Sequence, residues 1–437
     1  MIPILDLSTA QKTVLRRAPL NLWDFPPSVV EKTRALFGEG VTPPQAVARI
    51  LASIREEGDA ALRRWSALLD RTVPKEFRLS RDAMRKAWEM LPTDLASALR
   101  LAAQRIRAFH ERQPLPSWEH RDENGVLGQR LVPIERVGVY VPGGSAPLPS
   151  SLLMSVIPAQ VAGVETIVVC TPPEPHPTIL AAAYLCEVEH FYQVGGAQAI
   201  GAMAFGTESV PKVDKIVGAG NLWVTLAKQQ VFGVVGLDGL AGPTETMIIA
   251  DGSANPDWVA ADLLAQAEHD PLASAILLTP DSALAARVQE QIAHQIERLS
   301  RAEIISQSLA SRSGIVLTPD LETAADLANE YAPEHLCLSV ADPEALLPRL
   351  RHSGGIFIGE HSFEVLGDYV AGPSHVMPTG GSARFNSPLN ALDFVKVVSL
   401  IGLTPQAGEI LSRPAAVIAQ AETLTAHAAA AEKRFSG

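Results

Sequence analysis

Two stretches of the chain alternate short β-branched runs with segments of helical periodicity, and this alternation constrains the fold more than any other feature. The first stretch begins near residue 129 and contains RVGVYVP (136–142) and TIVVCTPP (166–173). The second contains ETMIIAD (245–251) and SAILLTP (274–280). Strands alternating with helices are typical of parallel sheets covered by helices. The pattern predicts an α/β fold with two parallel-rich sheets, in a chain of 437 residues that suits two or three domains.

The flanking segments are expected to be helical. Residues 44–112 carry apolar side chains at spacings of three and four with charges on the other faces, which indicates a helical region. After about residue 386 the chain is also predicted to be mainly helical, and it ends in the alanine-rich segment ETLTAHAAAAEKR (422–434). Because that segment has no clear core of its own, we expect it to pack against another surface, such as a second subunit.

Charge and composition argue against several classes of partner. The formal net charge of −12 gives no general attraction to a phosphate backbone or an anionic membrane, so nucleic acid is not expected. Prolines interrupt the uncharged run 137–164, which is therefore not expected to span a membrane. The N-terminus lacks the pattern of a secretory signal, which favours a cytoplasmic location. The three cysteines are isolated, so neither a disulfide framework nor a thiolate zinc site is predicted.

Gln266 and His269 lie three residues apart near the end of a predicted helix, in QAEHDP. Residues at this spacing share one helix face, so both side chains can converge on one atom. A cation there would also meet the negative end of the helix dipole. On its own, such a pair is more often a polar helix end than a ligand site, because polar pairs on one helix face are common.

Glu334 and His335 are neighbours in YAPEHL, between a predicted helix and an apolar run. Adjacent side chains diverge in regular structure, but Pro333 ends the helix and allows irregular backbone here. A carboxylate and an imidazole together supply two bases, one for water and one for an alcohol proton. The alternative is an exposed helix end.

Two further segments hold candidate polar groups. Asp368 and His375 lie in GDYVAGPSHVMPTGG, read as a loop after a strand, where open α/β sheets bind ligands beyond the carboxyl ends of their strands. The alternative is a solvated loop rich in turn residues. His427 lies in the alanine-rich segment with Glu422 five residues before it, where an ordinary surface histidine is the simplest interpretation.

These motifs occur in one order that resembles the histidinol dehydrogenases. RVGVYVPGGSAP, GGAQAIGAMAFGTESVPKVDKIVG, LAGPTE, QAEHDP, YAPEHL, GDYVAGPSHVMPTGG and LTAH carry the likeness, which runs from about residue 129 to the C-terminus. The resemblance implies two incomplete Rossmann-like domains, small helical N-terminal and C-terminal segments, and an intertwined homodimer. It also implies a zinc-dependent, NAD-linked oxidation of L-histidinol through L-histidinal to L-histidine, the last steps of histidine biosynthesis.

Carried over residue by residue, the resemblance implies one zinc per subunit. Its ligands would be Gln266, His269, Asp368 and His427, the last donated by the partner subunit in a shared site. Two imidazoles, a carboxylate and an amide oxygen suit a borderline cation, although glutamine is an unusual ligand.

The resemblance assigns His335 as the base for the alcohol proton and Glu334 as the base that activates water. Thr244, His375 and Glu422 would contact the substrate together with His335 and the four metal ligands. The family usually has serine where this chain has Thr244 and methionine where it has Gly239. These differences leave the substrate identity slightly open, because one methyl group in a pocket can shift specificity by roughly 10-fold or more.

NAD contacts are implied at Tyr140, Gln198 and Asn221. The usual phosphate-binding fingerprints are absent from both α/β stretches, so this assignment rests on the resemblance alone. Residues 218–221 read Gly-Ala-Gly-Asn, whereas the family commonly has Gly-Pro-Gly-Asn. Loss of that proline leaves the placement of the cofactor less defined.

The expected division of the chain has four parts. An N-terminal arm covers 1–30, and a larger α/β domain with the zinc and catalytic residues combines 31–135 with 243–385. A second α/β domain, 136–242, would bind NAD, and a helical domain, 386–437, would pack on the partner subunit.

Three other functions fit parts of the sequence. An enzyme of the same fold could oxidise a different polar alcohol, such as a sulfonated diol. A zinc hydrolase could use Glu334 to activate water without consuming NAD. A non-catalytic binding protein would need neither the metal ligands nor the Glu334 and His335 pair.

Overall fold

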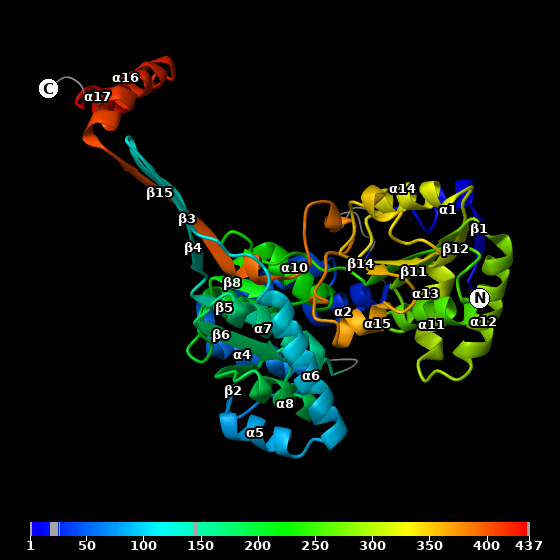
Figure 1. The fold of residues 1–437 in the computed structure, drawn as a ribbon. Coiled ribbons are helices and arrows are strands. Elements are labelled where there is room, and N and C mark those ends of the chain that lie inside the picture. The colour runs from blue at the N-terminus through cyan, green and yellow to red at the C-terminus, as the bar shows by residue number, and fades with distance from the viewer. Residues whose placement is uncertain (1, 18–24, 26, 144–146, 435–437) are drawn as a thin grey trace.

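The computed structural model describes residues 2–17, 25, 27–143 and 147–434, and within them two parallel-rich sheets form the body of the molecule (Figure 1). The first sheet is parallel throughout, in the order β1-β12-β11-β10-β13-β14. Its strands are β1 (Ile4–Asp6), β10 (Glu245–Ala250), β11 (Ser274–Thr279), β12 (Gly314–Leu317), β13 (His335–Ser339) and β14 (Gly355–Ile358). Strands β10 and β11 are buried along their whole length, as expected for strands covered on both faces.

Helices cover both faces of this first sheet. Ile248 and Leu277 pack with one helical layer, and Met247 and Ile276 pack with the other, because successive side chains point to opposite faces. One layer comprises α11 (Pro256–Ala267), α12 (Ser282–Ile296) and α13 (Ala302–Ser311), and the other comprises α1 (Leu7–Lys12) and α14 (Leu321–Tyr331). The short helix α15 (Glu364–Tyr369) follows β14.

The second sheet has the order β2-β7-β6-β5-β8-β9, with only β2 antiparallel among the described strands. Its strands are β2 (Arg78–Leu79), β5 (Arg136–Tyr140), β6 (Thr166–Thr171), β7 (His190–Gln193), β8 (Lys215–Val217) and β9 (Gly236–Leu237). Four helices from the same part of the chain pack on it: α7 (Pro149–Val161), α8 (Pro177–Leu185), α9 (Gly196–Phe205) and α10 (Leu222–Val231). Together with the first sheet, this architecture confirms the predicted α/β fold class.

The N-terminal helices also pack on the second sheet. They are α2 (Pro27–Phe37), α3 (Pro43–Glu57), α4 (Asp59–Trp65), the π-helix η2 (Ser66–Asp70), α5 (Arg81–Glu89) and α6 (Thr93–His110). Ile50 and Leu62 share a core with Val168, and Ile106 shares the opposite core with Val139. The apolar faces of these helices are thus buried against strands of 136–242, while the expected division of the chain into domains stays a prediction.

A three-stranded antiparallel sheet forms an arm that projects from the body (Figure 1). Its strands are β3 (Trp118–Asp122), β4 (Gly125–Pro133) and β15 (Val395–Leu403), and the arm ends in α16 (Pro405–Ala421) and α17 (Thr425–Glu432). The segment 386–437 is thus not mainly helical from its start, since β15 pairs with β4 over nine residues. No helix in the described ranges is long and apolar enough to cross a membrane.

Candidate active site

Most of the predicted site residues gather at the amino edge of the first sheet. Thr244 directly precedes β10 and His335 opens β13, so both lie where parallel strands begin. Helix α11 runs back against the strands, which returns Gln266, near its end, to the same edge. These residues therefore lie at the opposite edge from the carboxyl ends of the strands, where the sequence suggested a site. Asp368 lies in helix α15 and not in a loop.

Glu334 is a buried carboxyl group held by two donors. Thr244 Oγ1 donates to Glu334 Oε2 over 2.6 Å, and the backbone nitrogen of Glu245 donates to the same oxygen over 3.0 Å. Burial raises the pKa of Glu334 to about 7, although the neighbouring His335 and the Thr244 hydroxyl act in the opposite direction. A carboxyl group with this pKa is suited to accept a proton from water near neutral pH.

His335 is buried among three carboxyl groups. Its Nδ1 lies 3.2 Å from the carbonyl oxygen of Glu245, 3.7 Å from Glu334 Oε2 and 3.9 Å from Glu364 Oε1. Burial alone would lower the pKa of His335, but the carboxylates of Glu364, Glu334 and Asp368 raise it well above its ordinary value. Its Nε2 lies 3.7 Å from Asp368 Oδ1 and has no hydrogen-bond partner among the described residues. This buried, unpaired nitrogen is available to a ligand.

Gln266 is fully buried against the same groups. Its carboxamide lies 2.7 Å from Thr244 Oγ1 and 2.7 Å from the backbone nitrogen of Glu245. The amide is satisfied when its oxygen accepts from Glu245 N–H and its nitrogen donates to Glu364. The carboxamide is thus engaged by protein groups, and a metal would have to compete with the Glu245 N–H for its oxygen.

His269 and Asp368 supply an imidazole and a carboxylate at this edge. His269 is exposed in the single chain, but partial desolvation of its ring lowers the pKa, and the charge of Asp368 acts against that shift. Within the described ranges, no group of three or more His, Cys, Asp and Glu side chains is arranged to hold a metal ion. One amide, one imidazole and one carboxylate are chemically suitable for zinc but leave a tetrahedral site incomplete.

His375 connects the two α/β units. Its Nδ1 lies 2.8 Å from the carbonyl oxygen of Asp368, and its Nε2 lies 3.1 Å from Ser151 Oγ at the start of α7. Both ring nitrogens are therefore engaged, and the side chain braces Asp368 against the second sheet.

His427 and Glu422 are not near these residues within the chain. His427 lies in α17 and Glu422 follows α16, at the outer end of the arm and away from the α/β body (Figure 1). Both side chains are exposed. A site that includes them has to be completed by a second chain.

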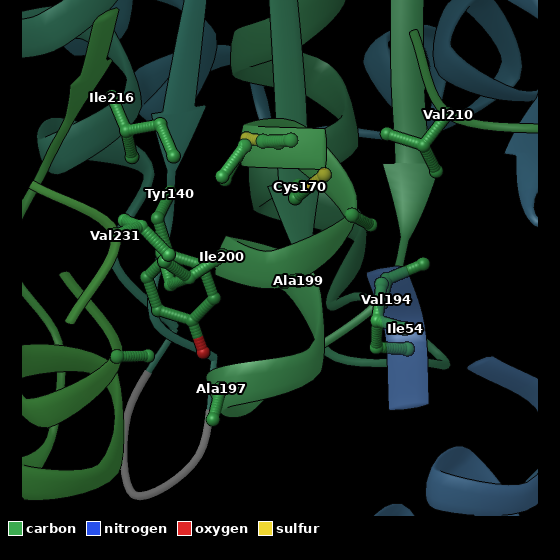
Figure 2. Packing of buried hydrophobic residues seen from close by; sticks show 14 of the residues in the cluster. Ile54, Tyr140, Cys170, Val194, Ala197, Ala199, Ile200, Val210, Ile216 and Val231 are labelled. Atoms are coloured by element: carbon green, nitrogen blue, oxygen red, sulfur yellow. The ribbon is translucent and has the colours of Figure 1, made fainter. Parts of the chain in front are cut away.

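The three residues expected to contact NAD line one cavity of about 540 Å³, at the carboxyl edge of the second sheet. Tyr140 ends β5, and its hydroxyl accepts from the backbone nitrogen of Gly196 over 3.0 Å. Figure 2 shows this ring beside Ile200 and Val231, with its hydroxyl directed toward the start of α9. Gln198 lies in α9, and Asn221 caps α10 by accepting from the backbone nitrogens of Trp223 and Val224.

The loop before Asn221 is fixed without the proline that the family usually has. Gly218 adopts a φ of 104°, and a Cβ there would meet the carbonyl oxygen of Tyr140 at 2.3 Å, so only glycine fits. Buried Lys228 donates to the carbonyl oxygen of Gly218 over 3.0 Å, and Asp238 accepts from Gly218 N–H over 2.8 Å. Lys228 and Asp238 also pair with each other at 2.5 Å. This buried pair holds the loop in place.

Several residues at the site were not identified from the sequence. Glu364 lies four residues before Asp368 on the same helix, and it contacts Thr246 and Gln266. Glu245 presents its backbone to both Glu334 and His335, while its side chain is held by Arg17. The spacing of Glu364 from Asp368 was a usable signal, since residues four apart share a helix face.

Comparisons with known proteins agree with this arrangement. The family model described as histidinol dehydrogenase matches residues 40–435. The histidinol dehydrogenase of Methylococcus capsulatus is 50% identical over 398 residues, covering 90% of this chain and 91% of the relative. That of Thermus thermophilus is 51% identical over 409 residues, covering 92% and 98%.

A solved structure gives the same result for the fold. The crystal structure of histidinol dehydrogenase from Elizabethkingia anophelis matches with a TM-score of 0.89 and 35% identity, over 100% of this chain and 98% of that chain. Sequence match, overall identity and fold therefore agree that the chain belongs to the histidinol dehydrogenase family of oxidoreductases.

Proposed function

We propose that the protein oxidises L-histidinol to L-histidine through L-histidinal and transfers two hydrides to two molecules of NAD. The observation that carries this proposal is the buried pair of Glu334 and His335, whose two bases serve the two halves of such a reaction. One base accepts the alcohol proton and the other activates water. Membership of the family, whose relatives are named histidinol dehydrogenase, supports the choice of substrate.

The first oxidation uses His335. In its neutral form, His335 accepts the hydroxyl proton of the substrate at its unpaired Nε2 while a hydride leaves the hydroxyl-bearing carbon for NAD, which gives the aldehyde. The surrounding carboxylates stabilise the imidazolium that forms.

The second oxidation begins at Glu334. Its carboxylate takes a proton from a water molecule while the oxygen of that water adds to the aldehyde carbon, and His335 returns the proton it took in the first oxidation to the carbonyl oxygen, which gives a hydrate. His335, neutral again, then accepts a hydroxyl proton of the hydrate while the second hydride leaves for another NAD, which yields the carboxylic acid that ionises to the product. Thr244 and the backbone of Glu245 orient Glu334 during this step.

Zinc fits the donor groups present, and Gln266, His269, Asp368 and the partner subunit's His427 would hold it. When bound, the ion supplies a Lewis-acidic centre that orients the amino alcohol and its imidazole. His375 keeps Asp368 in place, and Glu422 would contact the substrate from the arm. NAD would occupy the cavity lined by Tyr140, Gln198 and Asn221.

A homodimer with shared sites follows from the same proposal. Large apolar side chains on the arm are exposed in the single chain, among them Ile401 at 75%, Val417 at 66% and Ile418 at 60%. Exposed apolar groups gathered on a projecting arm are typical of a subunit interface. Pairing two chains through their arms would bury these residues and carry His427 to the other subunit.

The decisive experiment counts reduced cofactor per substrate. Zinc-loaded protein with limiting L-histidinol is expected to form two equivalents of NADH and one of L-histidine. One equivalent would indicate a simple alcohol dehydrogenase. Hydrolysis of an ester or amide without any NADH would indicate that Glu334 acts in a hydrolase. Oxidation of a sulfonated diol in place of L-histidinol would reassign the substrate.

A further inference from the structure

The cavity at the carboxyl edge of the second sheet has two walls of different origin. One wall comes from the ends of the strands and includes Tyr140, Pro172 and Gly196. The other comes from the N-terminal helices, and it contains the only charged groups among the described lining residues, Lys32 and Asp70. The helical wall therefore supplies the electrostatic character of the cavity.

Asp70 ends the π-helix η2 and lies over the ends of β6 and β7. Its Oδ2 accepts from Gln198 Nε2 over 3.0 Å. A Cβ on Gly195 would meet Asp70 Oδ1 at 3.2 Å and Pro172 Cα at 3.1 Å, so the carboxyl group is close to the residues that follow both strands. Asp70 is partly buried, and this burial raises the pKa of its carboxyl group.

Gln198 adds a second acceptor beside this carboxyl group. The residue is fully buried, and its Oε1 has no hydrogen-bond partner among the described residues. A buried carbonyl oxygen without a donor is costly, by about 1–3 kcal/mol, unless a ligand or water supplies one. The Asp70 carboxylate and Gln198 Oε1 thus form a pair of hydrogen-bond acceptors in the cavity lining. A ligand with hydroxyl donors would satisfy both.

A ribose diol has the required donors, whereas an ionised phosphate has none. In the ordinary dinucleotide-binding fold, an acidic residue after the second strand binds the ribose hydroxyls of the adenosine half. Here the second strand of the series is β6, and the first acid after it, Glu174, is exposed and is not among the residues that line the cavity. Asp70 reaches the same edge from a different segment of the chain.

The apolar part of the helical wall adjoins this acceptor pair. Leu36, Phe37, Ile50 and Leu69 line the cavity from the same helices that carry Asp70. An apolar surface of this kind suits a flat base such as adenine. Lys32 is the one positively charged residue among the described residues of the lining, and the pyrophosphate is the one anionic part of NAD.

We propose that Asp70, together with Gln198, binds the adenosine ribose hydroxyls of NAD and excludes NADP. The 2′-phosphate of NADP would remove a donor and bring negative charge against a partly buried carboxylate. The proposal rests on the function proposed above, because it assigns one end of the same cofactor site.

The test pairs Asp70→Asn with cofactors that differ only at the adenosine ribose. Asparagine keeps the shape and can still accept from Gln198 Nε2, but it removes the charge. In the wild-type protein, the 2′-deoxyadenosine analogue of NADH is expected to bind with a Kd about 10-fold higher than that of NADH. In Asp70→Asn the two Kd values are expected to differ by less than about 2-fold, because the hydroxyl has lost its strong acceptor.

NADP provides the second readout. The ratio of kcat/KM for NAD to that for NADP is expected to fall at least roughly 10-fold in Asp70→Asn. Glu165→Gln, an exposed carboxylate of the same α/β unit, serves as the matched control and is expected to leave both ratios unchanged.

Either of two results would overturn the proposal. One is an Asp70→Asn variant that weakens NAD and its deoxy analogue equally, because that outcome describes a structural role only. The other is a variant that retains the full preference for NAD over NADP. A wild-type protein that neither binds NADH nor reduces NAD would instead refute the proposed function, so the two failures are distinguishable.

Discussion

Thr244 Oγ1 donates a hydrogen bond to Glu334 Oε2 over 2.6 Å. This bond connects the LAGPTE segment to the carboxyl group that is proposed to activate water. The contact acts against the burial that raises the pKa of Glu334 to about 7. It therefore favours the ionised carboxylate, the form that can accept a proton. A serine would present the same hydroxyl, so the extra methyl of threonine does not alter this contact.

Replacing this hydroxyl tests its influence on Glu334. Thr244→Val removes the donor while keeping the shape, and the pKa of Glu334 is expected to rise further. Oxidation of L-histidinal at pH 7 should slow about 10-fold, and the acidic limb of its pH profile should move to higher pH. Thr244→Ser is the control and should retain both the rate and the profile. Identical profiles for the valine and serine variants would contradict a role for the hydroxyl.

The pH dependence of the wild-type protein follows from Glu334 itself. Since the carboxyl group is a base only when ionised, the rate of oxidation of L-histidinal should increase with pH through about 7.

The raised pKa of Glu334 also makes the free energy of unfolding depend on pH. Between the ordinary pKa of 4.5 and about 7, the folded state binds more protons at this group than the unfolded state. Its contribution to stability is present below pH 4.5 and is lost as the pH rises through about 7.

Glu334→Gln should separate the two oxidations. The amide cannot accept a proton from water, whereas His335 is still present for the alcohol step. The variant is expected to form one equivalent of NADH per L-histidinol and to accumulate aldehyde, which a carbonyl trapping reagent would detect. Retention of two equivalents at the wild-type rate would remove Glu334 from the water step.

Arg17 is predicted to position the catalytic pair from outside the region matched by the family model. It pairs with Glu245 in a bidentate ion pair, at 2.5 and 2.8 Å, and donates to the carbonyl oxygen of Tyr331 over 2.6 Å. The backbone of Glu245 in turn contacts both Glu334 and His335. Arg17 therefore fixes the start of β10.

Arg17→Met should lower the free energy of unfolding by about 3 kcal/mol, because it leaves Glu245 buried without its partner. It should also lower kcat more than it raises KM, since the displaced groups are the bases. Urea unfolding and steady-state kinetics measure the two effects. Arg16→Met, at the exposed neighbouring position, is the control. An equal loss of stability and of kcat in both variants would show that the N-terminal segment contributes only general stability.

The sequence predicts the parts of this molecule that depend on local pattern. The β-branched runs identify the central strands, because a strand buried on both faces is apolar along its length. Strand β15 was missed since its partner β4 lies more than 250 residues earlier, and its pairing is a tertiary property. The amino-edge location of the site was also missed, because it depends on helix α11 returning its polar end to the starts of the strands.

Buried and partly buried charges explain the remaining omissions. Glu245, Glu364 and Asp70 read as surface residues in the sequence, since glutamate and aspartate are seldom buried. Each is tied to a partner that is distant in sequence, namely Arg17, Thr246 and Gln198. Periodicity carries no information on such partners. Gln266 and His269 were recognisable together only because a spacing of three predicts one helix face, although α11 ends at Ala267 and His269 lies in the turn that follows it.

The position of His427 on the arm leads to a prediction about site sharing. His427→Ala should lose zinc and activity but keep the fold, because the side chain is exposed and remote from the core in its own chain. Gln266→Ala should lose zinc as well, since it removes a ligand from the body of the molecule. Metal content after dialysis and circular dichroism distinguish lost binding from lost folding.

Mixing the two inactive variants distinguishes donation within a chain from donation between chains. If the arm crosses to the other subunit, a mixed dimer has one site with an intact Gln266 and an intact His427, and one site that lacks both. Random reassociation makes about half of the dimers mixed, so about a quarter of the wild-type activity and zinc should return. If each chain used its own His427, every site in the mixture would lack one ligand. No recovery after verified subunit exchange would therefore rule out a shared site, because exchange is the only step that brings the two intact residues together.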